Sequence, residues 1–187
     1  EGTQPFLGVV FSLSSHHPYK VPEKYNGAFR TGQLEVHQAI QYTDHSLSQF
    51  FEIARKQNWY SNTLFVITAD HSTVAWSDKY DSQAGAFSIP ILYFDPGNES
   101  LSGQYNHVSQ QTDILPSILD YLHFPEPFIA FGKSIFDTSA SRIAFNYLNE
   151  HYQIIDDKSQ LSLSNGKELT DVYDISKSWI LTDNKIG

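Results

Sequence analysis

Three short, almost continuously apolar runs are the feature that most constrains the fold of this chain. They lie at residues 6–13 (FLGVVFSL), 63–69 and 89–94 (IPILYF), and turn-forming residues bound each of them. A strand buried on both faces gives such a run, because neither face is left for water. Between them, apolar residues recur at helical spacing over about 34–56, and the pattern returns near 112–122. We therefore predict an α/β fold with a mixed sheet flanked by helices.

From about residue 142 the pattern changes to short alternating runs. They lie at 142–148, 151–155, 159–163 and 169–173, separated by Asn149-Glu150, Asp156-Asp157 and Asn165-Gly166. Alternation interrupted by two-residue turn signals is typical of β-hairpins. We predict an α/β portion over residues 1–137, followed by a small antiparallel β subdomain over residues 138–187.

Charge and composition narrow the possible partners. The formal net charge is −9, which argues against a nucleic-acid partner, since that would need a basic face. The sequence holds no cysteine, so thiolate zinc sites are excluded. It has no apolar run near 18 residues, so we expect this chain itself to be soluble rather than membrane-spanning. It begins at Glu1, without a methionine, close to a strand-like run, which favours a fragment or a processed product.

Two of the strand-like runs end in side chains that can bind metals. His16 and His17 follow the first run, and Asp70 and His71 follow the second. If these strands are parallel, as the helix between them suggests, their carboxyl ends share the sheet edge where ligands bind. His107 would lie at the same edge if the third strand is also parallel.

A carboxylate beside a neutral imidazole suits zinc, manganese or a magnesium-like ion. Two ligands are too few, so the others must come from elsewhere in this chain or from outside it. The simpler alternative is a strand-end turn in which Asp70 and His71 only make hydrogen bonds.

Several longer stretches, in this order, resemble one enzyme family. They are SSHHPYKVPEKY, YTDHSLSQFF, NTLFVITADHS, IPILYF and SQQTDILPSIL, with FGKSIF and the final hairpins continuing the likeness. The resemblance is to the C-terminal part of the sulfatase-like catalytic domain, within the alkaline phosphatase superfamily. More narrowly, it is to lipoteichoic acid synthase and related phosphoglycerol transferases, and it covers roughly residues 5 to 175.

The resemblance implies a divalent metal, most often manganese, with zinc, magnesium or calcium as alternatives. Asp70 and His71 match the Asp-His pair that holds this metal in the family. His16 matches a histidine that contacts the phosphoglycerol head group, where it would position the substrate or protonate a leaving oxygen. Ser15 and His17 stand where the family usually has an asparagine and an aromatic residue, so this substrate loop departs from the pattern.

Two further residues are candidates for contacts with the substrate. Trp76 follows the Asp-His pair closely and could line the same pocket. His107 precedes the second predicted helix and has no match in the family's motifs.

In the family, the acidic metal ligand, the nucleophilic threonine and the membrane helices all lie upstream of these motifs. The resemblance therefore implies the C-terminal portion of a membrane-anchored enzyme with an extracytoplasmic catalytic domain, inactive by itself. Its substrate would be of the phospholipid or glycan type. Its partner would be the upstream half of its own catalytic domain, without which an exposed strand edge would lead to self-association.

Two other functions remain open. A sulfate-ester hydrolase shares the fold but uses a modified cysteine or serine as its nucleophile in place of threonine. A non-catalytic binding or structural module would bind no divalent metal tightly, even in the full-length protein.

Overall fold

The computed structural model describes residues 4–82, 84–164 and 168–175. The chain divides into a first compact unit, Glu1–Thr63 with Asp95–Gly97, and a second, Leu64–Phe94 with Asn98–Gly187. The boundary expected near residue 137 falls inside the second unit and stays a prediction.

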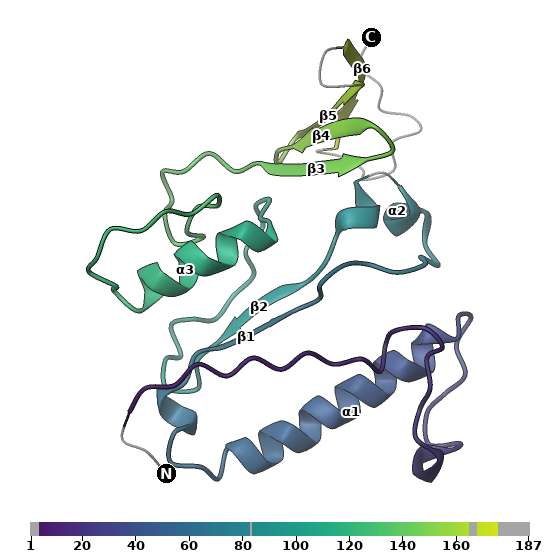
Figure 1. Ribbon diagram of the computed structural model, residues 1–187, viewed down its shortest axis with the longest axis vertical. Coiled ribbons are helices and arrows are strands. Elements are labelled where there is room, and N and C mark those ends of the chain that lie inside the picture. Colours follow the sequence, from purple (N-terminus) through teal and green to yellow (C-terminus); the bar gives the residue numbers. More distant parts are fainter. Residues whose placement is uncertain (1–3, 83, 165–167, 176–187) are drawn as a thin grey trace. The chain divides into compact units, whose positions relative to one another are not determined.

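The first unit is built around one long helix. Helix α1 spans Val36–Ala54, as the apolar spacing over 34–56 predicted, and two short 3₁₀ turns, Glu23–Tyr25 and Tyr60–Asn62, flank it in sequence (Figure 1). Among the described residues, no helix is both long and apolar enough to cross a membrane.

Residues 6–13 are extended but join no described sheet, so the prediction of a buried strand is wrong here. Their large side chains are exposed, reaching 90% for Leu7 and 92% for Val10. A strand of this composition is buried only when neighbouring strands pair with its backbone and helices cover its faces. The described residues supply no such neighbour.

The second unit begins with a two-stranded sheet. Strands β1 (Phe65–Thr68) and β2 (Ile91–Phe94) confirm the predicted strands (Figure 1). The rings of Phe65 and Phe94 stack with their centroids 5.9 Å apart. The two strands run antiparallel, with Phe65 opposite Phe94 and Thr68 opposite Ile91. The parallel arrangement considered for residues 89–94 is therefore wrong, and the carboxyl ends of β1 and β2 lie at opposite ends of this sheet. The connection between them carries α2 (Asp78–Asp81) and a 3₁₀ turn.

A 3₁₀ turn, Gln111–Asp113 (η4), leads into helix α3 (Ile114–Tyr121), which confirms the helix expected near 112–122. Pro116 is the third residue of α3, where its missing N–H removes no hydrogen bond. Asp113 is only 5% exposed, and its carboxylate accepts backbone N–H groups of Gln110 (3.0 Å) and Lys133 (2.8 Å). The turn is thereby anchored to a segment twenty residues away.

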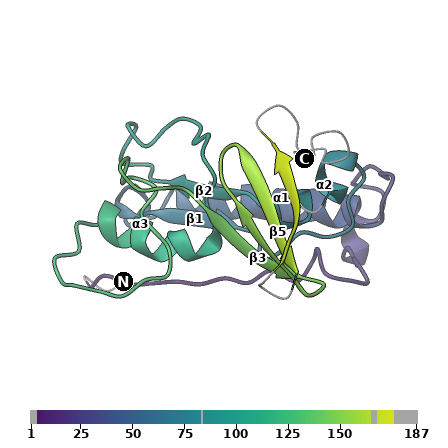
Figure 2. The same cartoon turned by 90° about the horizontal axis from the view of Figure 1, so that it is seen from above.

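The four predicted C-terminal strands form an antiparallel sheet, in which neighbouring strands follow one another in the sequence (Figure 2). They are β3 (Ala144–Leu148), β4 (His151–Ile155), β5 (Ser159–Ser164) and β6 (Glu168–Asp174). Asn149 and Glu150 both have positive φ, 52° and 64°, as a two-residue hairpin turn of type I′ requires. The predicted Asn165-Gly166 turn lies outside the described residues. A small core of Ala84, Ile155 and Ile175 packs beside this sheet.

The contact between Gly132 and turn η4 leaves no room for a side chain. A Cβ at Gly132 would lie 2.2 Å from the carbonyl oxygen of Thr112. We expect Gly132→Ala to lower the free energy of unfolding by about 1–3 kcal/mol, since the turn must shift to admit the methyl group. The measurement is the denaturant midpoint, with Gly8→Ala as the control because a Cβ there meets nothing within 4 Å. Equal midpoints for the two variants would contradict this packing.

Candidate functional site

Asp70 and His71 lie in the loop that follows β1, and each of them uses one side-chain atom in a local hydrogen bond. The His71 ring nitrogen Nδ1 lies 2.6 Å from the carbonyl oxygen of Ser72, which can only accept a hydrogen bond. Nδ1 must therefore carry the proton, and the lone pair of the neutral ring is on Nε2. The Asp70 oxygen Oδ1 accepts the backbone N–H of His71 at 2.9 Å. Asp70 Oδ2 and His71 Nε2 are therefore the atoms of this pair that can bind a ligand.

Asp70 Oδ2 and His71 Nε2 lie 3.5 Å apart. A charge-assisted hydrogen bond would bring them to about 2.7–2.9 Å, so the pair is not a closed ion pair. A cation about 2.0–2.2 Å from both atoms at a tetrahedral angle would leave them about 3.4 Å apart. Both side chains are exposed, 72% for His71 and 53% for Asp70. The pair thus has the donor types, the separation and the access that a divalent cation needs.

The protonated Nδ1 bound to a backbone carbonyl adds to this fit. Histidine ligands of metals commonly donate their second ring N–H to a carbonyl or carboxylate, which fixes the tautomer and the ring orientation. Among the described residues, however, no three His, Cys, Asp or Glu side chains gather as a metal site. Asp70 and His71 would therefore supply only two donors of a metal shell, which needs at least four positions.

Hydrogen bonds from distant segments hold this loop. The side chain of Gln111 donates from Nε2 to the carbonyl oxygens of Ala69 (3.0 Å) and Asp70 (2.8 Å). Thr68 donates to the Pro90 carbonyl at 2.9 Å, and the Ser72 hydroxyl donates to the Ala86 carbonyl. The segment from Thr68 to Ser72 is thus tied on both sides of the Asp-His pair.

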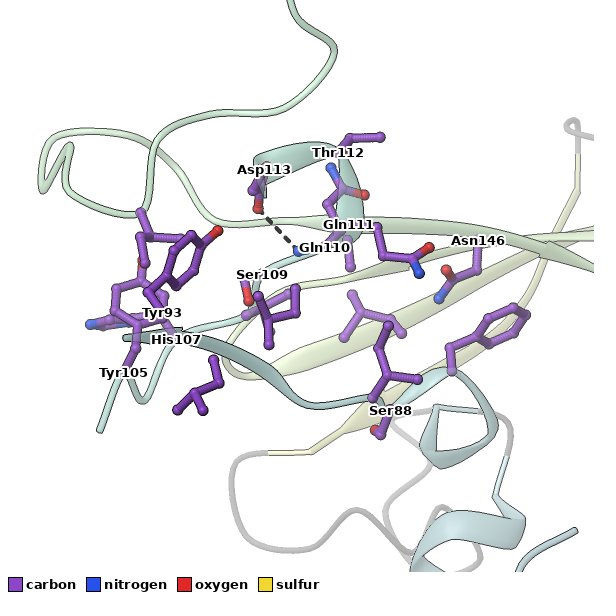
Figure 3. A pocket seen from close by; sticks show the side chains of 18 of the residues that line it. Ser88, Tyr93, Tyr105, His107, Ser109, Gln110, Gln111, Thr112, Asp113 and Asn146 are labelled. Carbon is purple, nitrogen blue, oxygen red and sulfur yellow. Dashed lines mark hydrogen bonds between the residues drawn. The ribbon is translucent and has the colours of Figure 1, made fainter. Parts of the chain in front are cut away.

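A pocket of about 1120 Å³ opens beside the pair, wholly within the second unit. Its lining combines η4 with residues of strands β2 and β3, and Tyr93, Tyr105 and His107 gather at one end (Figure 3). Burial raises the pKa of the Tyr93 hydroxyl, a hydrogen bond with Ser117 lowers it less, and the Asp113 carboxylate raises it further. Tyr93 therefore stays a neutral hydrogen-bonding group at physiological pH.

His107 lines this pocket and is held by an aspartate that the sequence indicated only as part of a hairpin turn. Its Nδ1 lies 2.6 Å from Oδ2 of Asp157, while Oδ1 accepts the backbone N–H of Val108 at 2.6 Å. Desolvation raises the pKa of the Asp157 carboxyl, but the hydrogen bonds from His107 and Val108 outweigh it, so the net pKa is lowered. The two residues are fifty positions apart, and no local sequence signal indicates such a contact.

The lowered pKa of Asp157 gives a pH-dependent contribution to stability. A carboxyl with a depressed folded-state pKa stabilises the fold fully above its unfolded pKa of about 3.9, and the effect is lost as the pH falls through the folded value. We expect Asp157→Asn to cost about 1 kcal/mol at pH 7, since the site is partly exposed, and the cost to shrink once the pH falls below the unfolded pKa of about 3.9. The measurement is the unfolding midpoint from pH 2.5 to 7 for wild type and Asp157→Asn. A difference that did not change with pH would contradict the assignment.

His16 and its neighbours Ser15 and His17, which we predicted to contact the substrate, lie in the first unit. His16 donates from Nδ1 to the His17 carbonyl at 2.8 Å, which leaves its lone pair on Nε2. The Ser15 hydroxyl meets the Thr43 hydroxyl of α1 at 3.2 Å, and the His17 ring contacts Tyr19 edge to face. This turn is tied to α1, whereas Asp70 and His71 belong to the second unit.

The other predicted contacts divide between the pocket and the surface. His107 lines the pocket beside Asp70 and His71, whereas Trp76 is 66% exposed and lies outside the pocket lining. The roles of Ser15, His16, His17, Trp76 and His107 toward a substrate stay predictions. Gln111 was not among the predicted site residues, although it contacts the loop of the Asp-His pair.

Comparison with known proteins gives a consistent family context. The sequence model of the sulfatase family matches residues 1–124. An arylsulfatase from Clostridium perfringens is 26% identical over 123 residues, covering 62% of this chain and 25% of that protein. Lipoteichoic acid synthase 1 from Bacillus subtilis is 26% identical over 152 residues, covering 71% of this chain and 23% of the relative. Lipoteichoic acid synthase from Staphylococcus aureus is 21% identical over 196 aligned positions, covering 93% and 30%.

The chain thus spans between about a quarter and a third of the length of the curated relatives it matches. Among solved structures, a protein of the alkaline phosphatase superfamily from Vibrio parahaemolyticus superposes with a TM-score of 0.71 at 21% identity. The superposition covers 92% of this chain and 42% of that protein. It confirms the predicted alkaline-phosphatase-like α/β fold.

Proposed function

This chain belongs to the sulfatase family, and from that premise we propose that it is the C-terminal part of the catalytic domain of a metal-dependent phosphoglycerol transferase. The observation that carries the proposal is the separation of 3.5 Å between Asp70 Oδ2 and His71 Nε2 beside a large pocket. Similarity to a lipoteichoic acid synthase extends over 93% of this chain, against 62% for the arylsulfatase, which supports transfer over sulfate hydrolysis.

In this proposal Asp70 and His71 hold the divalent ion, with manganese as the first choice and zinc, magnesium or calcium as alternatives. When bound, such an ion lowers the pKa of the nucleophile and stabilises charge on the transferred phosphoryl group. The Ser72 carbonyl keeps the proton of His71 on Nδ1, so that Nε2 is available without a change of tautomer. His16, with Nδ1 bound to the His17 carbonyl, offers Nε2 to orient the phosphoglycerol head group or protonate a leaving oxygen.

The remaining groups would come from the part of the parent enzyme that this chain does not contain. We propose that this part supplies the acidic metal ligand, the nucleophilic threonine and a membrane anchor that places the catalytic domain outside the cytoplasm. The threonine hydroxyl would attack the phosphorus of a phospholipid donor and displace diacylglycerol, which leaves as the alcohol, to form a phosphoglycerol ester of threonine. A hydroxyl of a lipid or glycan acceptor would then displace the threonine and take the phosphoglycerol group. The chain alone would then be inactive.

Metal binding by the full-length protein tests the proposal directly. We expect Asp70→Asn and His71→Gln each to weaken Mn²⁺ binding by about 10- to 100-fold or more, because each removes one donor from the shell. Turnover of phosphatidylglycerol should fall in parallel. The measurements are calorimetric titration with Mn²⁺ and release of diacylglycerol. Asp78→Asn, the same change at an exposed position of α2, is the matched control.

The outcomes separate the three functions. Activity on an aryl sulfate, lost in Asp70→Asn and absent on phosphatidylglycerol, would replace the proposal by the sulfatase alternative. Mn²⁺ affinity that is weak in wild type and unchanged in both variants would favour the non-catalytic module.

The exposed apolar segment supports the proposed partner, which is the upstream half of the same catalytic domain. Residues 6–13 are extended, with Val9 and Val10 exposed by 84% and 92% on opposite faces of the backbone. On α1, Ile40 and Ile53 are 48% and 64% exposed. An isolated edge of this kind pairs readily with another chain, whereas neighbouring strands in the parent would bury it.

We therefore expect the 187-residue chain alone to self-associate through residues 6–13. The sedimentation coefficient should rise with concentration in the micromolar range, and Val10→Asp should reduce the rise by adding a charge to the apolar edge. Val74→Asp, at a valine 68% exposed in another loop, is the control. A single sedimenting species over the whole concentration range would argue against this edge.

A further inference from the structure

We infer that Gln111 is the positioning residue of the Asp70–His71 pair: its side-chain amide sets the loop geometry that lets the two side chains share one ligand. This inference rests on the proposed function, because it assigns to Gln111 an effect on the metal site. Gln111 contributes no donor to the metal and acts through the backbone of the loop.

The hydrogen bonds of Gln111 fall on the two peptide groups that flank Asp70. Its Nε2 lies 3.0 Å from the Ala69 carbonyl oxygen and 2.8 Å from the Asp70 carbonyl oxygen. An amide nitrogen has two hydrogens, so each carbonyl receives one of them. The first carbonyl belongs to the peptide that enters Asp70, and the second to the peptide that joins Asp70 to His71. Fixing both peptide planes fixes the directions in which the two side chains leave the backbone.

The base from which Gln111 reaches the loop is itself immobilised. Gln111 opens turn η4, in which the buried carboxylate of Asp113 accepts the backbone N–H groups of Gln110 and Lys133. Gln110 also accepts the backbone N–H of Phe145 on its side-chain oxygen at 3.2 Å. Gln111 therefore connects the loop to a turn that hydrogen bonds from several segments hold in place.

The alternative role for Gln111 is contact with the substrate, since it also lines the pocket. Both of its N–H groups are used by the loop carbonyls, so only the oxygen Oε1 would remain for a ligand. A substrate contact would affect the Michaelis constant for the lipid and leave the loop and the metal unaffected. The two roles are therefore separable by measurement.

Two substitutions of similar length remove the donors in different ways. Gln111→Met deletes both N–H groups without adding charge. Gln111→Glu replaces them by an oxygen that repels the two carbonyls, yet its negative charge alone would tighten cation binding. If both variants weaken metal binding, the effect follows the lost donors and not the charge. Gln49→Met, on the exposed side of α1, is the matched control.

The first readout is hydrogen exchange of the metal-free, full-length protein. For a peptide covering residues 66–73, we expect exchange to be about tenfold faster in Gln111→Met than in wild type, because two hydrogen bonds that restrain the loop are lost. Exchange in the C-terminal sheet should be unchanged, which would show that the variant remains folded.

The second readout is Mn²⁺ binding, followed by electron paramagnetic resonance. We expect the dissociation constant to rise about tenfold in Gln111→Met and Gln111→Glu, and to stay at the wild-type value in Gln49→Met. Unchanged exchange and unchanged Mn²⁺ affinity in both Gln111 variants would overturn the inference, as would a change confined to the Michaelis constant of the lipid. If Asp70→Asn leaves Mn²⁺ affinity unchanged, the proposed function fails instead. The exchange experiment would still report whether Gln111 holds the loop.

Discussion

The arrangement of the second unit depends on one buried carboxylate. Asp113 accepts the backbone N–H groups of Gln110 and Lys133, and its own carbonyl oxygen accepts the Ser117 hydroxyl at 2.5 Å. A buried carboxylate is tolerated only when such donors replace its water. Because these groups lie at the start of α3 and on a later segment, the carboxylate fixes the turn from which Gln111 reaches the loop after β1. The same carboxylate therefore holds the start of α3, the segment at Lys133 and, through Gln111, the loop after β1.

Local patterns in the sequence were sufficient to predict most of the helices and strands. Apolar spacing predicted α1 and α3, and alternation with turn signals predicted all four strands of the C-terminal sheet, close to their observed bounds. The polar residues directly after an apolar run also placed Asp70 and His71 at the end of β1. These features are local, because helical periodicity, strand alternation and turn chemistry are all expressed within a few neighbouring residues.

Features that depend on contacts between distant residues could not be predicted in the same way. The antiparallel pairing of β2 with β1 depends on the path of the connection between them, which no short pattern encodes. The contacts of His107 with Asp157 and of Gln111 with Asp70 join residues 50 and 41 positions apart. Residues 6–13 have the composition of a buried strand, but composition does not reveal whether a neighbour is present.

The proposed upstream half of the catalytic domain would account for two features of this chain at once. Asp70 and His71 would form a two-donor set whose geometry Ser72 and Gln111 already restrain, so that orienting them for a cation would cost little. Residues 6–13 form an extended apolar segment that no described strand pairs. The fold neighbour is more than twice as long as the region it shares with this chain. A single upstream half, as proposed, would supply both the remaining metal ligands and the neighbouring strands, so that sheet completion and site assembly would be one event.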